Sequence, residues 1–193
     1  VRAGFGMMMA LGVGEPPAIG AAEDADANGV KVRIYTPAGT SPGARPVVVY
    51  YHGGGWVLGD LDSHDWVCRK LANGAQCAVL SVDYRMAPEF LFPAAYDDSF
   101  AALKWAVANA GMLKIDPKRI SVGGDSAGGN LAAAVAIGAR DAGGPALKAQ
   151  ILVYPAVDLS MSGDYYGRYT KDLVLTDDTM RWFIDLYIPD KVQ

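Results

Sequence analysis

The chain has 193 residues, of which 51% are hydrophobic and 20% are charged, and its formal net charge is −4. These values are ordinary for a globular protein with one sizeable core. No lysine- or arginine-rich run is present, which argues against nucleic acid as a partner. No stretch approaches the roughly 18 apolar residues of a membrane helix, so stable membrane insertion is not expected. We expect a cytoplasmic protein, and a homodimer stays open.

Strand-like and helix-like segments alternate along the chain. Residues 15–28 are rich in proline, glycine, alanine and acidic residues, which predicts a loop. Short β-branched or alternating segments predict strands at residues 30–35, 47–51, 78–82, 120–123 and 147–154. Amphipathic or alanine-rich segments predict helices at residues 63–74, 97–109, 131–140 and 176–187, the last one capped by Thr176. The alternation predicts a doubly wound α/β fold with a mostly parallel sheet covered on both faces.

Ser126 lies at the centre of a Gly-x-Ser-x-Gly sequence between a predicted strand and a predicted helix. In that context the pattern is typical of a nucleophile elbow, a strained turn that exposes a serine hydroxyl beyond the end of a sheet. Gly124 and Gly128 remove side chains that would collide with the strand and the helix. The amino end of the helix also favours negative charge that develops near the serine. These features make Ser126 the candidate nucleophile.

A run of glycines in the segment His52–Trp56 directly follows the predicted strand at residues 47–51. Consecutive glycines let the backbone turn its N–H groups toward a ligand, and acyl transfer needs such donors for the oxyanion of its tetrahedral intermediate. Both this loop and Ser126 follow strands directly, so they fall on the same rim of a parallel sheet, where ligands bind. The two motifs together indicate a site for acyl transfer.

Three segments resemble the hormone-sensitive-lipase-like carboxylesterases of the α/β-hydrolase fold. They are His52–Trp56, Asp83–Glu89 and Gly124–Asn130, and the likeness runs from about Val30 to the end of the chain. The third motif of the family usually has leucine where this chain has Met86, a volume-conserving exchange.

The resemblance implies a role for each matching residue. Ser126 would be the nucleophile, and the backbone N–H groups of Gly54, Gly55 and Ala127 would form the oxyanion hole, with Gly53 shaping the same loop. Supporting roles for the loop and the elbow would belong to His52, Gly124, Asp125 and Gly128. Asp125 would act as a local hydrogen-bonding residue rather than as the triad acid. Neither a cofactor nor a metal is implied.

The chain departs from the family in its histidines. In this fold the nucleophile is followed by an acid and then by the histidine base, but His52 and His64 both precede Ser126. We therefore expect a fragment of a longer enzyme that is inactive or nearly so by itself. Residues 1–28 would be part of an N-terminal lid or linker. Residues 29–193 would be an incomplete hydrolase core, with the start of a lid segment near residues 160–193.

Several other polar and aromatic residues have alternative interpretations. We expect His64 at the surface or rim, Asp83 and Arg85 in a buried pair, Glu89 in support of the same loop, and Asp158 to be a poor triad acid. Pocket lining and ordinary packing both stay open for Trp56, Tyr154, Tyr187 and Met7–Met9. Cys68 and Cys77 lack the spacing of a metal site and are expected to be free thiols.

The leading hypothesis is a carboxylic ester hydrolase that acts on short to medium acyl chains through an acyl-enzyme on Ser126. Its partner would be a small-molecule ester. A non-catalytic ligand-binding protein of the same fold is an alternative, because plant gibberellin receptors resemble this family and keep the serine without the histidine. A preference for amides or lactones is a third possibility, since the same apparatus can cleave them.

Overall fold

The structure is a computed structural model that describes residues 2, 4–6, 14–39, 43–163, 167 and 173–189. Its centre is a six-stranded sheet with the strand order β1-β2-β4-β3-β5-β6. The strands are β1 (Ala21–Asp26), β2 (Lys31–Thr36), β3 (Arg45–Tyr51), β4 (Ala78–Asp83), β5 (Ile115–Asp125) and β6 (Gln150–Val153). Strands β4, β3, β5 and β6 run parallel to one another, whereas β2 pairs antiparallel with both of its neighbours, β1 and β4. The predicted doubly wound α/β fold is confirmed.

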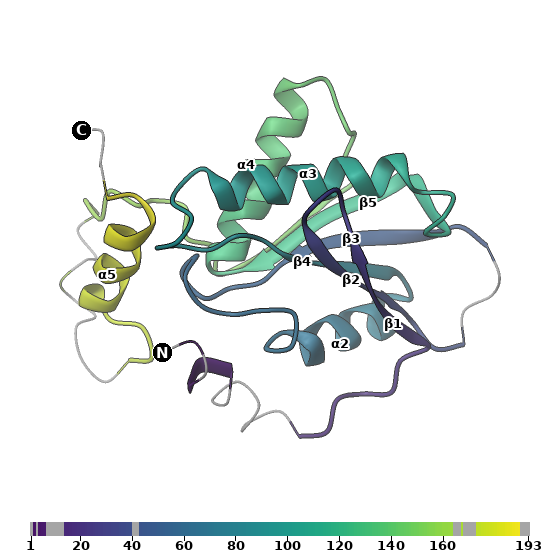
Figure 1. Cartoon of the computed structure of the whole chain (residues 1–193), viewed down its shortest axis with the longest axis horizontal. Coiled ribbons are helices and arrows are strands. Elements are labelled where there is room, and N and C mark those ends of the chain that lie inside the picture. Colours follow the sequence, from purple (N-terminus) through teal and green to yellow (C-terminus); the bar gives the residue numbers. More distant parts are fainter. Residues whose placement is uncertain are drawn as a thin grey trace.

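The helices are α2 (Asp65–Ala75), α3 (Ala94–Ala108), α4 (Ala127–Asp141) and α5 (Asp177–Tyr187). The first three of them cover the two faces of the sheet. Helices α3 and α4 lie on one face and α2 on the other (Figure 1). Along β3, Val49 and Tyr51 join the core of the α3 and α4 face, whereas Val48 and Tyr50 join the core of the α2 face. Burial on both faces explains why this strand is a continuous apolar run.

Strand β1 corrects the prediction of a loop over residues 15–28. It pairs antiparallel with β2 across the register Ala21 to Thr36, so residues 21–26 belong to the sheet. Asp24 forms ion pairs with Lys31 and Arg33 of β2. Most β1 side chains are exposed, so the strand lacks the apolar alternation that marks a buried strand, and cross-strand pairing stabilises it instead.

Helix α5 lies apart from α2, α3 and α4, at one end of the molecule (Figure 1). Thr176 caps it as predicted, since the Thr176 side chain accepts a hydrogen bond from the Thr179 N–H. Tyr187 stacks on Trp56 of the glycine loop, with ring centroids 4.6 Å apart. Helix α5 therefore packs against the loop that the sequence identified as a donor of N–H groups. Met7–Met9, which the sequence analysis named as pocket candidates, lie outside the described residues.

No helix among the described residues has both the length and the apolar character that crossing a bilayer requires. Cys68 lies in α2 and Cys77 directly precedes β4, and both are buried free thiols, as predicted.

Candidate active site

Ser126 occupies a sharp turn between β5 and α4. Its φ of 54° and ψ of −116° are unusual for a residue with a side chain. Neighbouring backbone holds this strained conformation in place. The Ser126 N–H donates to the Val153 carbonyl at 2.9 Å, and the Ser126 carbonyl accepts from Asn130 N at 3.0 Å and Ala156 N at 3.2 Å. No described residue is recorded as hydrogen-bonded to the Ser126 hydroxyl, which leaves it available to a ligand.

The glycines of the elbow are required by close backbone approach. A Cβ atom on Gly128 would lie 1.9 Å from the Tyr51 carbonyl oxygen and 2.6 Å from that of His52. A Cβ atom on Gly124 would lie 2.4 Å from both the Tyr51 oxygen and the Gly128 carbonyl carbon. The elbow thus packs its backbone directly against the end of β3, where the glycine loop begins.

The glycine loop turns sharply after β3. Gly54 has a φ of 118°, and its carbonyl accepts hydrogen bonds from Val57 N at 3.1 Å and Leu58 N at 2.8 Å. The Gly53 N–H donates to Asp125 Oδ1 at 3.0 Å, so this group is already occupied. Within the described part of the chain, no acceptor is recorded for the N–H groups of Gly54, Gly55 and Ala127. This is the arrangement that an oxyanion hole needs.

A cavity of about 340 Å³ contains the nucleophile candidate and these donors. Its polar lining includes Ser126, His64 and Asp125, and the N–H-bearing residues Gly54, Gly55 and Ala127 also line it. The rest of the wall is mostly apolar and comes from distant segments: Phe5, Trp56, Leu58, Tyr154, Ala156, Val174, Leu175, Thr179, Met180 and Phe183. An apolar chamber with a few convergent polar groups is typical of a small-molecule site.

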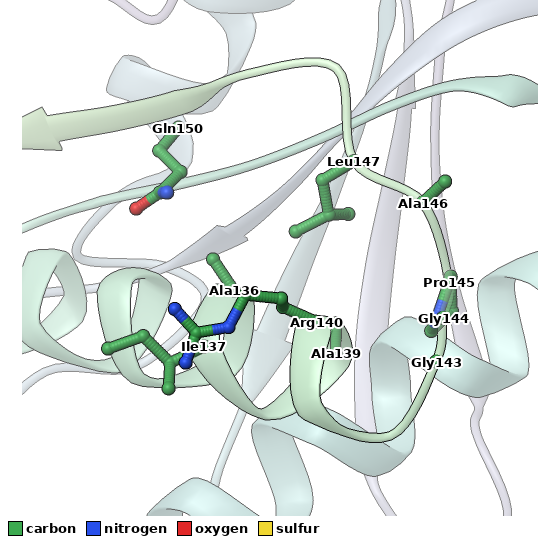
Figure 2. Close-up of a pocket in the computed structure, with 10 residues that line it drawn as sticks. All are labelled: Ala136, Ile137, Ala139, Arg140, Gly143, Gly144, Pro145, Ala146, Leu147 and Gln150. Carbon is green, nitrogen blue, oxygen red and sulfur yellow. The ribbon is translucent and has the colours of Figure 1, made fainter.

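A second cavity, of about 470 Å³, lies between the carboxyl end of α4 and the segment that leads into β6 (Figure 2). Its lining is mostly small or apolar, and its charged side chain, Arg140, already pairs with Asp141. It opens near the amino end of β6, whereas Ser126 follows the carboxyl end of β5. Although larger, it offers no nucleophile, so the 340 Å³ cavity is the candidate site.

His52 is wholly buried beneath the glycine loop. Its Nδ1 lies 2.8 Å from the Gly53 carbonyl oxygen, to which it donates, and its ring stacks on Tyr84 with centroids 4.3 Å apart. Burial and the nearby His64 lower the pKa of His52 to about 4, so the ring is neutral at pH 7. His52 therefore contacts the glycine loop from beneath through the Gly53 carbonyl.

His64 corrects the expectation of a surface or rim residue, because it is only 2% exposed. Its Nε2 lies 3.4 Å from Asp125 Oδ1, and its Nδ1 lies 3.0 Å from Ser63 Oγ. Asp125 Oδ1 also accepts a hydrogen bond from the Tyr50 hydroxyl at 2.8 Å. Burial opposes ionisation of Asp125, but His64 and the hydrogen bonds from Tyr50 and Gly53 outweigh it and lower its pKa.

The expected pair of Asp83 and Arg85 is wrong. Arg85 instead pairs with Asp98 of α3, whose carboxylate accepts from the Arg85 backbone N–H at 2.9 Å and from its guanidinium at 2.8 Å. Asp98 is therefore the buried acid that pairs with Arg85, and it lies thirteen residues after Arg85 in the sequence. Glu89 is exposed and pairs with Arg2. Asp158 accepts hydrogen bonds from Ser160 and is not among the residues that line the cavity.

The sequence analysis did not name Tyr50, or the α5 residues Thr179, Met180 and Phe183, as parts of the site. The sequence could have indicated Tyr50, because this residue lies near the end of a strand that leads to the glycine loop. The alternation of side chains along a strand places it on the face opposite Tyr51. The sequence predicts Phe183 only as an apolar residue of a helix. In the structure its ring lies so close to Gly55 that a Cβ atom on Gly55 would be 2.3 Å from it. Among the described residues, no group of His, Cys, Asp and Glu side chains is arranged to hold a metal.

Known proteins share this arrangement of sequence and fold. Residues 48–193 match the family Abhydrolase_3, described as having the alpha/beta hydrolase fold. The carboxylesterase NlhH of Mycobacterium tuberculosis is 50% identical over 163 residues, which are 83% of this chain and 50% of that protein. The ethyl acetate hydrolase of Pseudomonas putida is 40% identical over 166 residues, which are 84% of this chain and 52% of that protein. The chain thus spans about half the length of these curated relatives.

Solved structures agree with this match. An esterase from the archaeon Pyrobaculum calidifontis superposes with a TM-score of 0.85 at 43% identity, over 96% of this chain and 63% of that one. An alpha/beta hydrolase enzyme from the metagenome of Lake Arreo superposes with a TM-score of 0.93 at 38% identity, over 100% of this chain and 62% of that one. Because the matched residues 48–193 include both the glycine loop and the elbow, the chain belongs to the Abhydrolase_3 family of α/β hydrolases.

Proposed function

We propose that the protein is a carboxylic ester hydrolase with Ser126 as its nucleophile. The observation that carries the proposal is the strained Ser126 at the wall of a mostly apolar cavity, which is also lined by Gly54, Gly55 and Ala127 with N–H groups that no described residue occupies. Relatives named as a carboxylesterase and an ethyl acetate hydrolase support the ester as the substrate class. The apolar wall supports an acyl chain of short to medium length.

The reaction would proceed in two acyl-transfer steps. The Ser126 hydroxyl oxygen attacks the ester carbonyl carbon while its proton passes to a general base, and the carbonyl oxygen becomes an oxyanion that accepts hydrogen bonds from Gly54, Gly55 and Ala127. The alcohol leaves with a proton returned by the base, which gives an acyl-enzyme. Water then attacks this ester, and the acid leaves while the Ser126 hydroxyl is restored.

We propose that neither histidine of the chain is the general base. His52 Nδ1 is engaged with the Gly53 carbonyl beneath the loop, and His64 is engaged with Asp125 and Ser63. We therefore propose that the proton acceptor lies outside these 193 residues. The relatives, which are about twice as long, are consistent with this proposal.

Imidazole rescue tests both parts of the proposal. The 193-residue chain should hydrolyse p-nitrophenyl butyrate at a rate near background, because it lacks the base, and added imidazole should raise the rate by filling that role. The control is Ser126→Ala, which must respond to imidazole no more than buffer does. With imidazole present as the base, a fluorophosphonate should label Ser126 and not the exposed Ser160.

The outcomes separate the candidate functions. Labelling at another serine, or equal imidazole response in Ser126→Ala, would refute the nucleophile. Substantial turnover without imidazole that His52→Ala or His64→Ala abolishes would show that the base lies within the chain. Saturable binding of the ester, with neither labelling nor turnover under any of these conditions, would favour a binding protein. Faster cleavage of a matched amide or lactone would shift the substrate class.

A further inference from the structure

One carboxylate lies between the nucleophile elbow and the glycine loop. Asp125 immediately precedes Ser126, and its Oδ1 accepts the Gly53 N–H at 3.0 Å from a segment 72 residues earlier in the chain. Gly53 is followed directly by Gly54 and Gly55, whose N–H groups have no acceptor among the residues that the structure describes. A single side chain therefore connects the backbone of the nucleophile to the backbone of the oxyanion donors.

The carboxylate is itself held by two buried side chains. The Tyr50 hydroxyl donates to Asp125 Oδ1 at 2.8 Å, and His64 Nε2 lies 3.4 Å from the same oxygen. The Asp125 side chain is 15% exposed, so water competes weakly for this oxygen. Tyr50 belongs to β3 and His64 directly precedes α2, which gives the contact two supports on separate elements.

The other side of Gly53 is fixed as well. Its carbonyl accepts from His52 Nδ1 at 2.8 Å, and the Tyr84 hydroxyl donates to the His52 carbonyl at 2.7 Å. A Cβ atom on Gly53 would lie 2.2 Å from Asp125 Oδ2, so the loop approaches the carboxylate as closely as a glycine allows. These contacts make the position of the loop depend on Asp125 rather than on the loop sequence alone.

We propose that Asp125, held by Tyr50 and His64, is a positioning residue that sets the distance between the Ser126 nucleophile and the oxyanion donors. The structural part of this proposal, that Asp125 restrains Gly53, does not depend on the proposed function. The catalytic part of the proposal rests on that function. An oxyanion donor acts only when it points at the place where charge develops, and small displacements of such groups reduce turnover strongly. Loss of the Asp125 contacts should therefore lower kcat while leaving the apolar cavity and KM nearly unchanged.

The test compares Tyr50→Phe and Asp125→Asn with the matched control Tyr51→Phe. Tyr51 lies on the same strand, is also buried, and points to the opposite face, where its hydroxyl donates to the Ser99 carbonyl at 3.1 Å. Each tyrosine variant loses one buried hydroxyl, and only Tyr50→Phe loses a donor to Asp125. Amide hydrogen exchange of Gly53, relative to sheet amides such as Val122, reports the loop position without any catalysis.

Tyr50→Phe and Asp125→Asn should each speed the relative exchange of the Gly53 amide about tenfold, the effect of one lost hydrogen bond near a charge. Both should lower the kcat of Ser126-dependent, imidazole-supported hydrolysis about tenfold or more, with KM within about twofold. Asp125→Asn, which keeps an acceptor oxygen, should retain more activity than Asp125→Ala. Tyr51→Phe should change neither the relative exchange nor kcat by more than about twofold.

Equal exchange of Gly53 in Tyr50→Phe, Asp125→Asn and Tyr51→Phe would overturn the proposal, as would faster exchange without any loss of kcat. A rise in KM with unchanged kcat would overturn it too, because that pattern indicates a binding role. A wild-type chain that, with imidazole present, neither turns over nor reacts with a phosphonate would instead refute the proposed function. In that case the exchange comparison by itself decides whether Asp125 holds the loop.

Discussion

Substitution of Gly128 by alanine should unfold the elbow, although Gly128 lies in a helix where alanine is intrinsically preferred. Its new methyl group would lie 1.9 Å from the Tyr51 carbonyl oxygen and 2.6 Å from that of His52, both of them backbone atoms. No side-chain rotation relieves such contacts, so α4 and the end of β3 must separate by more than 1 Å to bring the shorter distance even to 3.0 Å, below which such contacts essentially do not occur. Overpacked cores lose about 1–3 kcal/mol, and the backbone clash places this variant at about 3 kcal/mol or above.

Gly74→Ala in α2 is the matched control. Gly74 is exposed in a helix and a Cβ atom there meets nothing within 4 Å, so this variant should gain about 0.5–1 kcal/mol of stability. Urea unfolding measures both, through the midpoint at unchanged m-value. The expected result is a large fall in the midpoint for Gly128→Ala and a small rise for Gly74→Ala. A Gly128→Ala midpoint equal to or above that of the wild type would refute the close-approach argument.

Three further predictions concern buried groups. His52 has a folded-state pKa of about 4 against an ordinary value near 6.5, so between those pH values the unfolded chain binds a proton that the folded chain does not. The free energy of unfolding should therefore fall by at most about 1.4 kcal/mol per pH unit as the pH drops from about 6.5 to about 4. An NMR titration midpoint near 6.5 for His52 would contradict this. Burial raises the pKa of the Cys68 thiol to about 12, so at pH 8 a disulfide reagent should modify Cys68 only after urea unfolding, and modification of the native chain at the rate of free cysteine would exclude the buried thiol. Asp98→Ala should lower the free energy of unfolding in urea by about 1–3 kcal/mol, because it removes the acceptor of the Arg85 backbone N–H and guanidinium, and Asp98→Asn should lower it less. A decrease below about 0.5 kcal/mol for Asp98→Ala would show that the pair contributes little.

The elbow and the glycine loop could be predicted from the sequence because the backbone conformations that they require depend on neighbouring residues in the chain. A serine in a strained turn needs small neighbours, which appear as Gly124 and Gly128, and backbone donors after a strand need consecutive glycines. The positions of the strands that carry them were readable for the same reason, since buried strands such as β3 and β4 are short apolar runs. The sequence did not predict strand β1, because its exposed acidic side chains show no apolar pattern and what holds it is its pairing with β2, including the ion pairs of Asp24 with Lys31 and Arg33.

The sequence by itself therefore determined the fold class, the candidate nucleophile and the place of the candidate oxyanion donors, because local backbone geometry demands particular residue types at those positions. Only the tertiary structure decided which side chains hold them there. It buried His64 against Asp125, paired Arg85 with Asp98 rather than Asp83, and brought the Tyr50 hydroxyl within 2.8 Å of Asp125. Such partners are set by which strands and helices pack side by side, and a carboxylate binds whichever donors that packing brings within hydrogen-bond distance.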